Sequence, residues 1–389
     1  MSGDMSACLY PWFESIKAEG GLSALSHQVG DYSLFYQTLI SLMTYIPISC
    51  VFQYKILSGV FDAAVAVALA VIYRDLCLGE ATQTGTLAPM AKSDRQSIIT
   101  TSCVLGIAVW MLPTVILNSA YWGQCDSIFS FFCLMTLYLL RRDSWIGAFV
   151  FLGLAFACKL QTVFVLPIIS VYYLVSKRFS AIYLLITVAV LWLSGILAFA
   201  YGRDLLAPVS IYLEQSREYP EMYVNFTSFW TIVGNDYGVM KWFAILFTLF
   251  VLSVGAYYCL RRKELFRSGV SFYAAAAWFM WSMLLFLPCM HDRYAYLLDL
   301  LLVLLAFLDR RFVPCAVVSV LTSLFLYAGY LFVPKGAGVD FTSLRVATVI
   351  YLLTYLYFTA VLCLGGLKRL TCTSQTLSET CKTIEGEND

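Results

Sequence analysis

The sequence predicts an all-α fold, a polytopic bundle with about ten or eleven helical membrane segments. Hydrophobic residues make up 61% of the 389 residues and charged residues only 13%, with a mean hydropathy of +0.79. A soluble domain is about half apolar and about one quarter charged. Apolar runs long enough to cross a bilayer recur along the chain, and Lys and Arg cluster at their ends. The net charge of +1 argues against a nucleic-acid partner.

The basic clusters indicate where the chain turns on the inner side of the membrane. They are Arg74 with Lys92 and Arg95, Arg141-Arg142, Lys177-Arg178, Arg261-Arg262-Lys263, Arg310-Arg311, and Lys368-Arg369. Between successive clusters the chain is long enough to cross outward and return. The predicted pairs of segments are 96–117 with 127–140, 181–200 with 239–260, 269–288 with 294–309, and 313–333 with 346–366.

The stretch 145–176 has basic clusters at both ends, so it predicts two short helices with a break near Lys159. The run at 56–73 then crosses inward, which places residues 1–55 outside. No signal-peptide pattern begins that outer segment, so we expect a further transmembrane helix ahead of Met1.

A single membrane domain is predicted for residues 1–370, followed by a Thr/Ser/Glu-rich cytoplasmic tail, 371–389, which we expect to be disordered. The inner loops are short and basic, whereas most other polar residues fall in the outer segments. These outer segments are 1–55, 118–126, 201–238, 288–293 and 334–345. The outer face is therefore where a functional site is expected.

The sequence contains no motif typical of metal binding or nucleotide binding. The chain has only two histidines, and most of its 13 cysteines lie inside apolar runs without any CxxC pair. Glycine-rich phosphate loops and the HExxH zinc motif are also missing from the sequence. We therefore expect no metal site and no cofactor.

Two polar groups in the first outer segments could bind or react. Asp4 follows Gly3 just outside the membrane, where it could act as a general base or be a surface acid on a loop. Trp122 and Tyr121 suit the aromatic belt of the membrane interface. Asp126 directly precedes an apolar run and could cap that helix, while Gln124 with Trp122 favours a ligand contact.

Lys159 and Gln161 interrupt an otherwise apolar hairpin. A lysine at this break cannot easily reach water, so an anionic partner would have to offset its desolvation. A bound phosphate could supply the negative charge, and so could a carboxylate such as Asp126. The alternative is an ion pair with a purely structural role.

Two further polar motifs lie late in the chain. The longest outer loop carries Tyr219-Pro220-Glu221, Asn225 and Trp230, and we interpret it as a substrate-binding surface. Asn225-Phe226-Thr227 is also an N-glycosylation sequon. In His291-Asp292-Arg293-Tyr294, a His and an Arg together could neutralise a phosphate leaving group. The alternative is an Arg at the membrane interface with an Asp partner.

These motifs, in this order, resemble the GT-C class of membrane glycosyltransferases, and more narrowly the bacterial relatives of the GPI-anchor mannosyltransferases. The matching segments are Gly3-Asp4 to Pro11-Trp12, Gly20 to Leu25, Gly30-Asp31-Tyr32, Trp122 to Asp126, Lys159 with Gln161, Tyr219-Pro220 with Asn225 and Trp230, and His291 to Tyr294. Family members often have Glu where Asp292 stands and a Pro-rich stretch where Ser33-Leu34-Phe35 stands.

The resemblance implies transfer of mannose or another hexose, with inversion, from a polyprenyl-phosphate donor to a hydroxyl of a glycan or lipid-linked acceptor. It implies an active site facing outward from a membrane, which we take as the bacterial cell membrane. The base corresponds to Asp4. The implied substrate-binding residues are Asp31, Tyr32, Trp122, Gln124, Asp126, Lys159, Gln161, Asn225, His291, Arg293 and Tyr294.

Two other classes of function stay open at this point. A multi-pass transporter or permease would also place charges at membrane depth and use broken helices. Transporters often show repeated halves, and the sequence shows no internal repeat. An inactive member of the family that serves as a scaffold is the third possibility.

Overall fold

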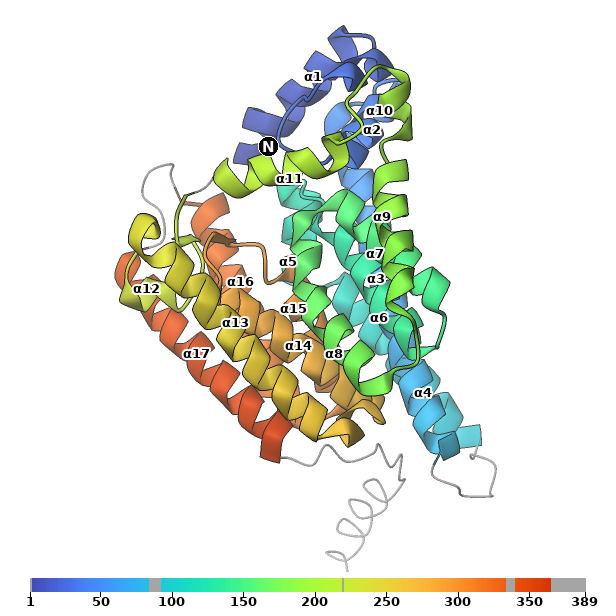
Figure 1. Ribbon diagram of the computed structural model, residues 1–389, viewed down its shortest axis with the longest axis vertical. Helices are drawn as coiled ribbons and strands as arrows, with labels where there is room; N and C mark the ends of the chain where they lie inside the picture. The colour runs from blue at the N-terminus through green and yellow to red at the C-terminus, as the bar shows by residue number, and fades with distance from the viewer. Residues whose placement is uncertain (1, 84–91, 219, 334–339, 365–389) are drawn as a thin grey trace, which may run out of the picture.

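The structure is a computed structural model that describes residues 2–83, 92–218, 220–333 and 340–364, and it is almost entirely helical within those residues (Figure 1). Strand in this part of the chain is limited to a short parallel pair, β1 (Tyr223–Val224) with β2 (Met290–His291). The all-α prediction is confirmed. Tyr219, the basic pair Lys368-Arg369 and the tail 371–389 lie outside the described residues.

Five helices in the described ranges are long and apolar enough to cross a membrane. They are Cys50–Gly79 within α3 (Cys50–Gln83), α13 (Tyr237–Arg261), α14 (Gly269–Phe286), Arg310–Leu331, which joins η7 (Arg310–Phe312) to α16 (Val313–Leu331), and α17 (Phe341–Leu364). A sixth span results if α4 (Lys92–Trp110) and the segment Pro113–Trp122 count as one helix bent by 42°. Pro113 lies at this bend, as expected for a residue that cannot continue the helical hydrogen bonds.

The remaining predicted membrane segments are helices too short to be counted as spans. They are α6 (Asp126–Arg141), α7 (Trp145–Cys158), η4 (Leu160–Val165) with α8 (Leu166–Ser176), η5 (Ala181–Tyr183) with α9 (Leu184–Leu193), and α15 (Tyr296–Leu308). A helix therefore stands at each predicted segment, but length and composition support five or six crossings rather than ten or eleven. Two of these short helices have an end beside a polar cavity inside the protein: α7 ends at Cys158, and α15 begins at Tyr296.

Residues 2–49 form a compact group of helices rather than an open outer segment. These helices are η1 (Met5–Leu9), α1 (Tyr10–Ala18), η2 (Gly21–Ser26) and α2 (Leu34–Met43), which together we call the cap. The cap lies at one end of the molecule (Figure 1). Phe13 and Ile16 of α1 are buried, and the Ser33 hydroxyl caps α2 by accepting from the Tyr36 backbone N–H.

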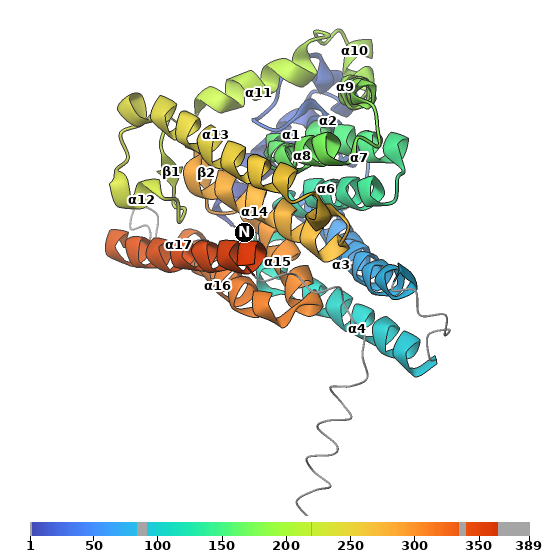
Figure 2. The same ribbon diagram turned by 60° about the horizontal axis from the view of Figure 1, so that its bottom comes forward.

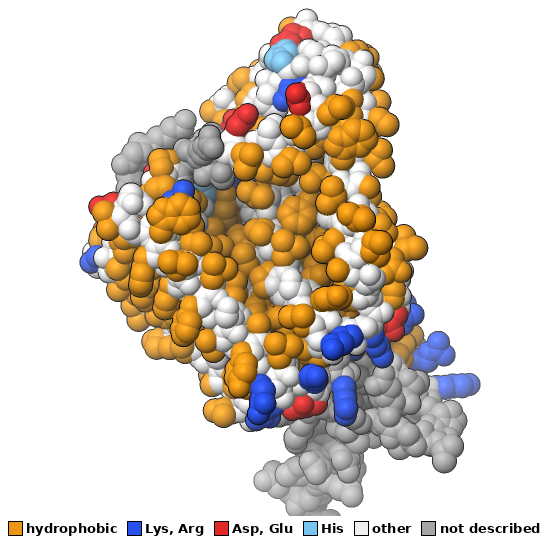
Figure 3. All heavy atoms as spheres, in the orientation of Figure 1, with side chains coloured by type: hydrophobic (Ala, Val, Ile, Leu, Met, Phe, Trp, Pro, Cys, Tyr) orange, Lys and Arg blue, Asp and Glu red, His pale blue; other side chains and the backbone are white. Residues whose placement is uncertain are grey.

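Other short helices complete the cap end. Figure 1 shows α10 (Ile196–Ala200) and α11 (Ala207–Glu218) beside the cap, and α12 (Trp230–Val233) at the same end of the bundle. At the other end, the Arg141 guanidinium donates to the Phe266 carbonyl at 2.7 Å, which joins the end of α6 to η6 (Lys263–Phe266). Most of the Lys and Arg side chains visible in Figure 3 gather at this end, opposite the cap.

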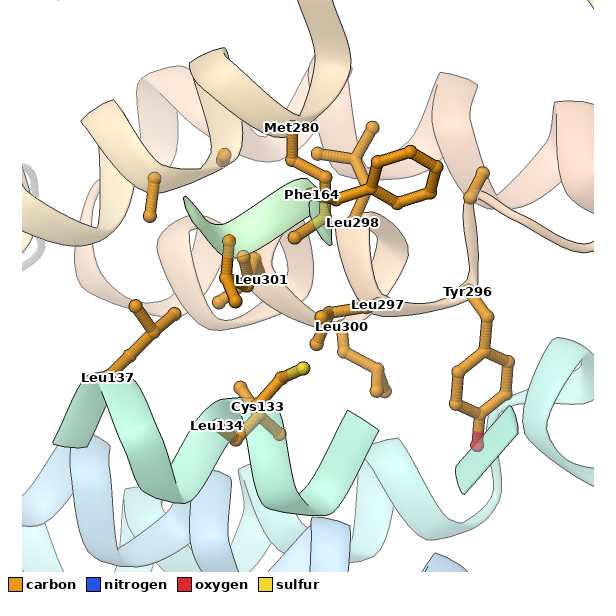
Figure 4. Packing of buried hydrophobic residues seen from close by; sticks show 14 of the residues in the cluster. Cys133, Leu134, Leu137, Phe164, Met280, Tyr296, Leu297, Leu298, Leu300 and Leu301 are labelled. Carbon is orange, nitrogen blue, oxygen red and sulfur yellow. The ribbon is translucent and has the colours of Figure 1, made fainter. Parts of the chain in front are cut away.

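Helix α14 is the centre of the bundle, with all of its residues buried. It contacts α13, α15 and α17, and Figure 2 shows it between α13 and α17. Figure 4 shows Met280 of α14 together with Leu298 of α15 and Phe164 of η4, above the α6 residues Leu134 and Leu137. The buried core therefore joins the later helices to those that follow the cap.

Candidate functional site

A cavity of about 350 Å³ lies at the cap end of the bundle. The surface is hollowed below the cap in Figure 3. The cap contributes Asp4, Cys8, Leu9, Trp12, Asp31, Tyr32 and Ser33 to its lining. The remaining lining residues are Cys158, Lys159, Gln161, Gln215, Val224, Asn225, His291, Asp292, Arg293, Tyr294 and Tyr330. Residues far apart in the sequence thus meet at one place.

The predicted site residues are brought together here. Asp4, Asp31, Tyr32, Lys159, Gln161, Asn225, His291, Arg293 and Tyr294 all line the cavity. Trp122, Gln124 and Asp126 lie behind its wall, where they contact the lining residues. The parallel pairing of β1 with β2, which sets Val224 opposite His291, brings the long outer loop to the late motif.

Asp4 begins the helical segment η1, and its carboxylate is held by side chains from distant elements. Its Oδ2 accepts from the Trp122 indole N–H at 2.8 Å and from the Gln124 amide at 2.6 Å. Its Oδ1 accepts from the Tyr330 hydroxyl. The Arg293 guanidinium lies 3.7 Å from Oδ2. The interpretation of Asp4 as a surface acid on a loop is therefore wrong.

Trp122 does not belong to an interfacial aromatic belt, because its side chain is fully buried. Its ring stacks on Tyr330, with the centroids 4.6 Å apart. Tyr121 is 45% exposed and remains compatible with the belt. The chain reverses after η3 (Leu117–Trp122) at Gly123, whose φ of +82° favours glycine, and this turn directs Gln124 toward Asp4.

Asp126 is the first residue of α6 and does not cap it, because the N-cap is Cys125 and makes no side-chain cap bond. Its buried carboxylate instead accepts from the Lys159 ammonium and, at 2.8 Å, from the Asn118 amide. The predicted break is confirmed, since Lys159 has extended backbone between α7 and η4. An anionic protein partner for Lys159 is thus present.

Arg293 lies between the two carboxylates. Its Nε is 3.9 Å from Asp126, and its guanidinium carbon is 5.5 Å from the centre of the Trp122 ring. Nε is buried and has no hydrogen-bond partner within the part of the chain that the structure describes. The alternative interpretation expected an Asp partner for Arg293, and the structure provides two: its guanidinium forms ion pairs with the carboxylates of Asp4 and Asp126.

His291 is uncharged at neutral pH. Burial and the nearby charges of Arg293 and Lys159 lower the pKa of His291 to about 3. In the folded chain the positive charge beside the cavity therefore comes from Arg293 and Lys159, and neutralisation of a phosphate by His291 together with Arg293 stays a prediction. His291 can donate a neutral hydrogen bond to a ligand.

Asp292 and Asn225 form a second polar contact beside the cavity. The Asn225 amide donates to Asp292 Oδ2 at 3.4 Å and to the Leu326 carbonyl at 3.2 Å. Burial raises the pKa of Asp292 to about 6. Thr227 of the sequon is fully buried, so the folded chain holds this tripeptide in its interior rather than on a surface open to glycosylation.

Several contributors to the site were not among the predicted site residues, and three of them show why. Tyr330 lies inside an apolar run, and nothing in the sequence distinguishes it from a core tyrosine. Asn118 lies at the end of an apolar run, eight positions before Asp126. A polar residue in that place is a signal that the sequence does contain. Trp12 belongs to a motif that carried the family resemblance, but the indole itself was not selected.

The arrangement places a carboxylate and two cations on one small cavity, where they can act on a ligand that combines hydroxyl groups with an anion. Within the described residues no group of three His, Cys, Asp or Glu side chains is placed to hold a metal ion. No protein-family model matches the chain, and no curated protein matches it. The family resemblance of the motifs therefore stays a prediction.

Proposed function

We propose that this chain is a membrane glycosyltransferase that moves a hexose, such as mannose, from a polyprenyl-phosphate donor to an acceptor hydroxyl, with inversion. One observation carries the proposal: Asp4, Lys159 and Arg293 line the same cavity at the cap end of an apolar helical bundle. Such a transfer needs a base, a site for the leaving phosphate and a membrane that holds the lipid.

Asp4 is the proposed general base. Its Oδ2 is occupied by Trp122 and Gln124, which fix the orientation of the carboxylate. Within the described residues its Oδ1 accepts a hydrogen bond from the Tyr330 hydroxyl alone, and a carboxylate oxygen can accept a further one. The acceptor hydroxyl would give its proton to Oδ1 as its oxygen attacks the anomeric carbon. General-base help of this kind supplies about 10²–10⁴-fold in rate.

Arg293 and Lys159 are the proposed partners of the leaving group. As the new bond forms, the bond between the anomeric carbon and the phosphate oxygen breaks, and the oxygen leaves with the electron pair. Positive charge fixed in advance stabilises that developing negative charge most effectively where water is scarce. Contacts with Asp4 and Asp126 hold the cations in place before the substrate arrives.

A membrane fraction supplied with a radiolabelled polyprenyl-phosphate mannose and, separately, the glucose equivalent tests this function. We expect the wild-type chain to transfer label from at least one donor to endogenous acceptors. Asp4→Asn keeps the size and one oxygen that can accept from Trp122 and Gln124 but cannot take up a proton as a carboxylate does, so turnover should fall at least about 10²-fold.

The matched control is Asp236→Asn, because Asp236 is an exposed N-cap of α13 and asparagine caps helices equally well. Transfer by the control should equal that of the wild type. The proposal is wrong if the wild-type chain transfers label from none of the donors. Near-normal turnover of Asp4→Asn would remove Asp4 from the mechanism.

A further inference from the structure

Trp12 lies on the wall of the cavity that Asp4 also lines. It lines the cavity together with Asp4 and Cys8, at intervals of four residues along one face of the first helical segments. The side chain is only partly buried, unlike that of Trp122. Its indole N–H has no hydrogen-bond partner among the described residues. Trp12 is therefore an aromatic surface beside the proposed base.

The backbone of Gly30 covers one face of this indole. A Cβ added at Gly30 would lie 2.4 Å from both Cδ2 and Cε2 of Trp12. These two atoms form the bond shared by the two rings, so the approach is onto the face of the indole rather than its edge. Gly30 also has a φ of +74°, which favours glycine. Trp12 also lines the cavity, so part of the indole that Gly30 does not cover can contact whatever enters it.

The loop that carries Gly30 is held in place by side-chain contacts. The Gln28 amide donates to the Gly30 carbonyl at 2.8 Å and to the Tyr32 carbonyl at 2.9 Å. Arg203 donates to Gln28 Oε1 at 2.6 Å. Tyr32 meets the Trp12 ring edge-on, with the centroids 5.5 Å apart. The indole is thus fixed before any ligand binds, which lowers the entropic cost of binding.

The neighbours of Trp12 on the cavity wall are polar. Asp31 and Gln215 both line the cavity, and the Gln215 amide donates to the Asp31 backbone carbonyl. The Asp31 carboxylate itself has no hydrogen-bond or ion-pair partner among the described residues. An indole face next to groups that bind hydroxyls suits a sugar ring, which has apolar C–H faces and a polar rim. An isoprenoid chain would not use these polar groups.

We propose that Trp12 is the stacking platform for the acceptor and that the acceptor is a saccharide. This inference rests on the proposed function, because it takes Asp4 as the base. Trp12 lies on the same helical face as Asp4, so a sugar stacked there has its hydroxyls on the side of the base. Lys159 and Arg293, assigned to the donor phosphate, come from other parts of the chain.

Binding can be measured without any transfer. The full chain, labelled with 5-fluorotryptophan and placed in lipid nanodiscs, gives fluorine resonances from its nine tryptophans. Trp12→Phe identifies the Trp12 resonance, and Trp110→Phe identifies that of an exposed tryptophan on α4 as the control. The probes are the methyl α-glycosides of mannose, glucose and galactose, with glycerol as a polyol and undecaprenyl phosphate as a lipid anion.

We expect the Trp12 resonance, but not that of Trp110, to move with at least one glycoside and not with glycerol. Movement only with undecaprenyl phosphate would show a lipid subsite, and no movement with any glycoside would show a structural role. Either result overturns the inference. In the transfer assay with a glycoside acceptor, Trp12→Phe should raise the acceptor KM about tenfold while kcat changes little.

Gly30→Ala moves the indole without removing it, because its Cβ would collide with the ring, and it should raise the acceptor KM in the same direction. Two outcomes separate this inference from the function on which it rests. Glycoside binding at Trp12 without any transferase activity would remove the proposed function and leave saccharide binding. Transfer with an unaltered acceptor KM in Trp12→Phe would remove the inference alone.

Discussion

Charges of opposite sign offset one another on the cavity wall. Arg293 lies within 4 Å of both Asp4 and Asp126, and Asp126 also pairs with Lys159. Removing one partner of a buried ion pair leaves the other charge uncompensated, which typically costs about 3–5 kcal/mol of stability. Loss of activity in a single variant at this site therefore does not by itself separate a structural role from a functional one.

Paired substitutions at Lys159 and Asp126 distinguish a structural role of Lys159 from a functional one. Lys159→Ala should lower both the amount of folded protein in the membrane and transfer, because Asp126 is then left with less compensation. Adding Asp126→Asn removes the orphaned charge, so the double variant should regain abundance while transfer stays low. Quantitative immunoblotting and the transfer assay give the two readouts. Recovery of transfer in the double variant would show that Lys159 is purely structural.

The neutral state of His291 has a consequence for stability. The pKa of His291 is about 3 in the folded chain and about 6.5 for an unperturbed histidine. Below pH 6.5 the unfolded chain therefore binds more protons at this residue, and stability contributed by His291 is lost as the pH falls. Asp292, with its pKa raised to about 6, acts in the opposite direction over an overlapping range.

Comparison with His291→Gln isolates the histidine, since glutamine keeps hydrogen bonding but does not titrate. Between pH 7 and pH 5 the thermal-aggregation midpoint of the wild type should fall further than that of the variant. Measurements in one detergent at matched ionic strength would show the difference. Parallel pH profiles for the two proteins would mean that His291 is already charged, or equally solvated, in the folded chain.

The sequence identified many of the residues that line the cavity because charge is conspicuous in an apolar chain. Asp4, Lys159 and Arg293 all stood out for this reason. Charge state could not be predicted in the same way, since the neutrality of His291 depends on burial and on residues distant in sequence. Tyr330 was missed because an apolar run gives a tyrosine no distinguishing signal.

Helix positions followed from the apolar runs and basic clusters, whereas helix lengths did not. α7 ends at Cys158 and α15 begins at Tyr296, each beside a cavity-lining segment. Whether a helix ends at the membrane surface or inside the protein depends on tertiary contacts. The cap was missed for another reason: its main helices, α1 and α2, have only 9 and 10 residues, shorter than the apolar runs from which membrane segments were predicted.

The turn after η3 is the element-level test of how Asp4 is held. Gly123→Ala introduces strain at a φ of +82° and places a Cβ 2.4 Å from Met5 Cε, near the start of the cap. Gly202→Ala has nearly the same φ, +86°, but meets nothing within 4 Å. Both should lose about 1 kcal/mol or more of stability, while only Gly123→Ala should disturb the cap and reduce transfer.

Thermal midpoints compare the stability of the two glycine variants, and the transfer assay compares their activity. Adding Met5→Ala removes the colliding methyl group and should recover part of the transfer lost in Gly123→Ala. Equal transfer by the Gly123 and Gly202 variants would show that the contact between this turn and the cap does not support the site.

At the scale of the whole molecule, the cavity and most of the basic side chains visible in Figure 3 lie at opposite ends. We predict that the cap end faces the outside and the basic end faces the cytoplasm, as the distribution of Lys and Arg favours. Ser23 in the cap and Arg262 after α13 are both exposed and suit cysteine labelling.

In intact cells an impermeant maleimide should label Ser23→Cys, and it should label Arg262→Cys only after permeabilisation. The unsubstituted chain gives the background from native cysteines, of which Cys103 is exposed. Labelling of both positions from the same side would contradict the predicted arrangement of the chain across the membrane.

The complete burial of α14 has a consequence for how the protein is made. The Trp278 indole donates to Thr359 at 2.9 Å, and the Ser282 and Tyr355 hydroxyls bond at 2.8 Å, so α14 finds polar partners in α17. Synthesis runs from the N-terminus, so α14 leaves the ribosome before α17 exists. During that interval its tryptophan and serine lack these partners. A nascent chain stalled before Phe341 would therefore expose polar groups that membrane chaperones and quality-control proteases can recognise.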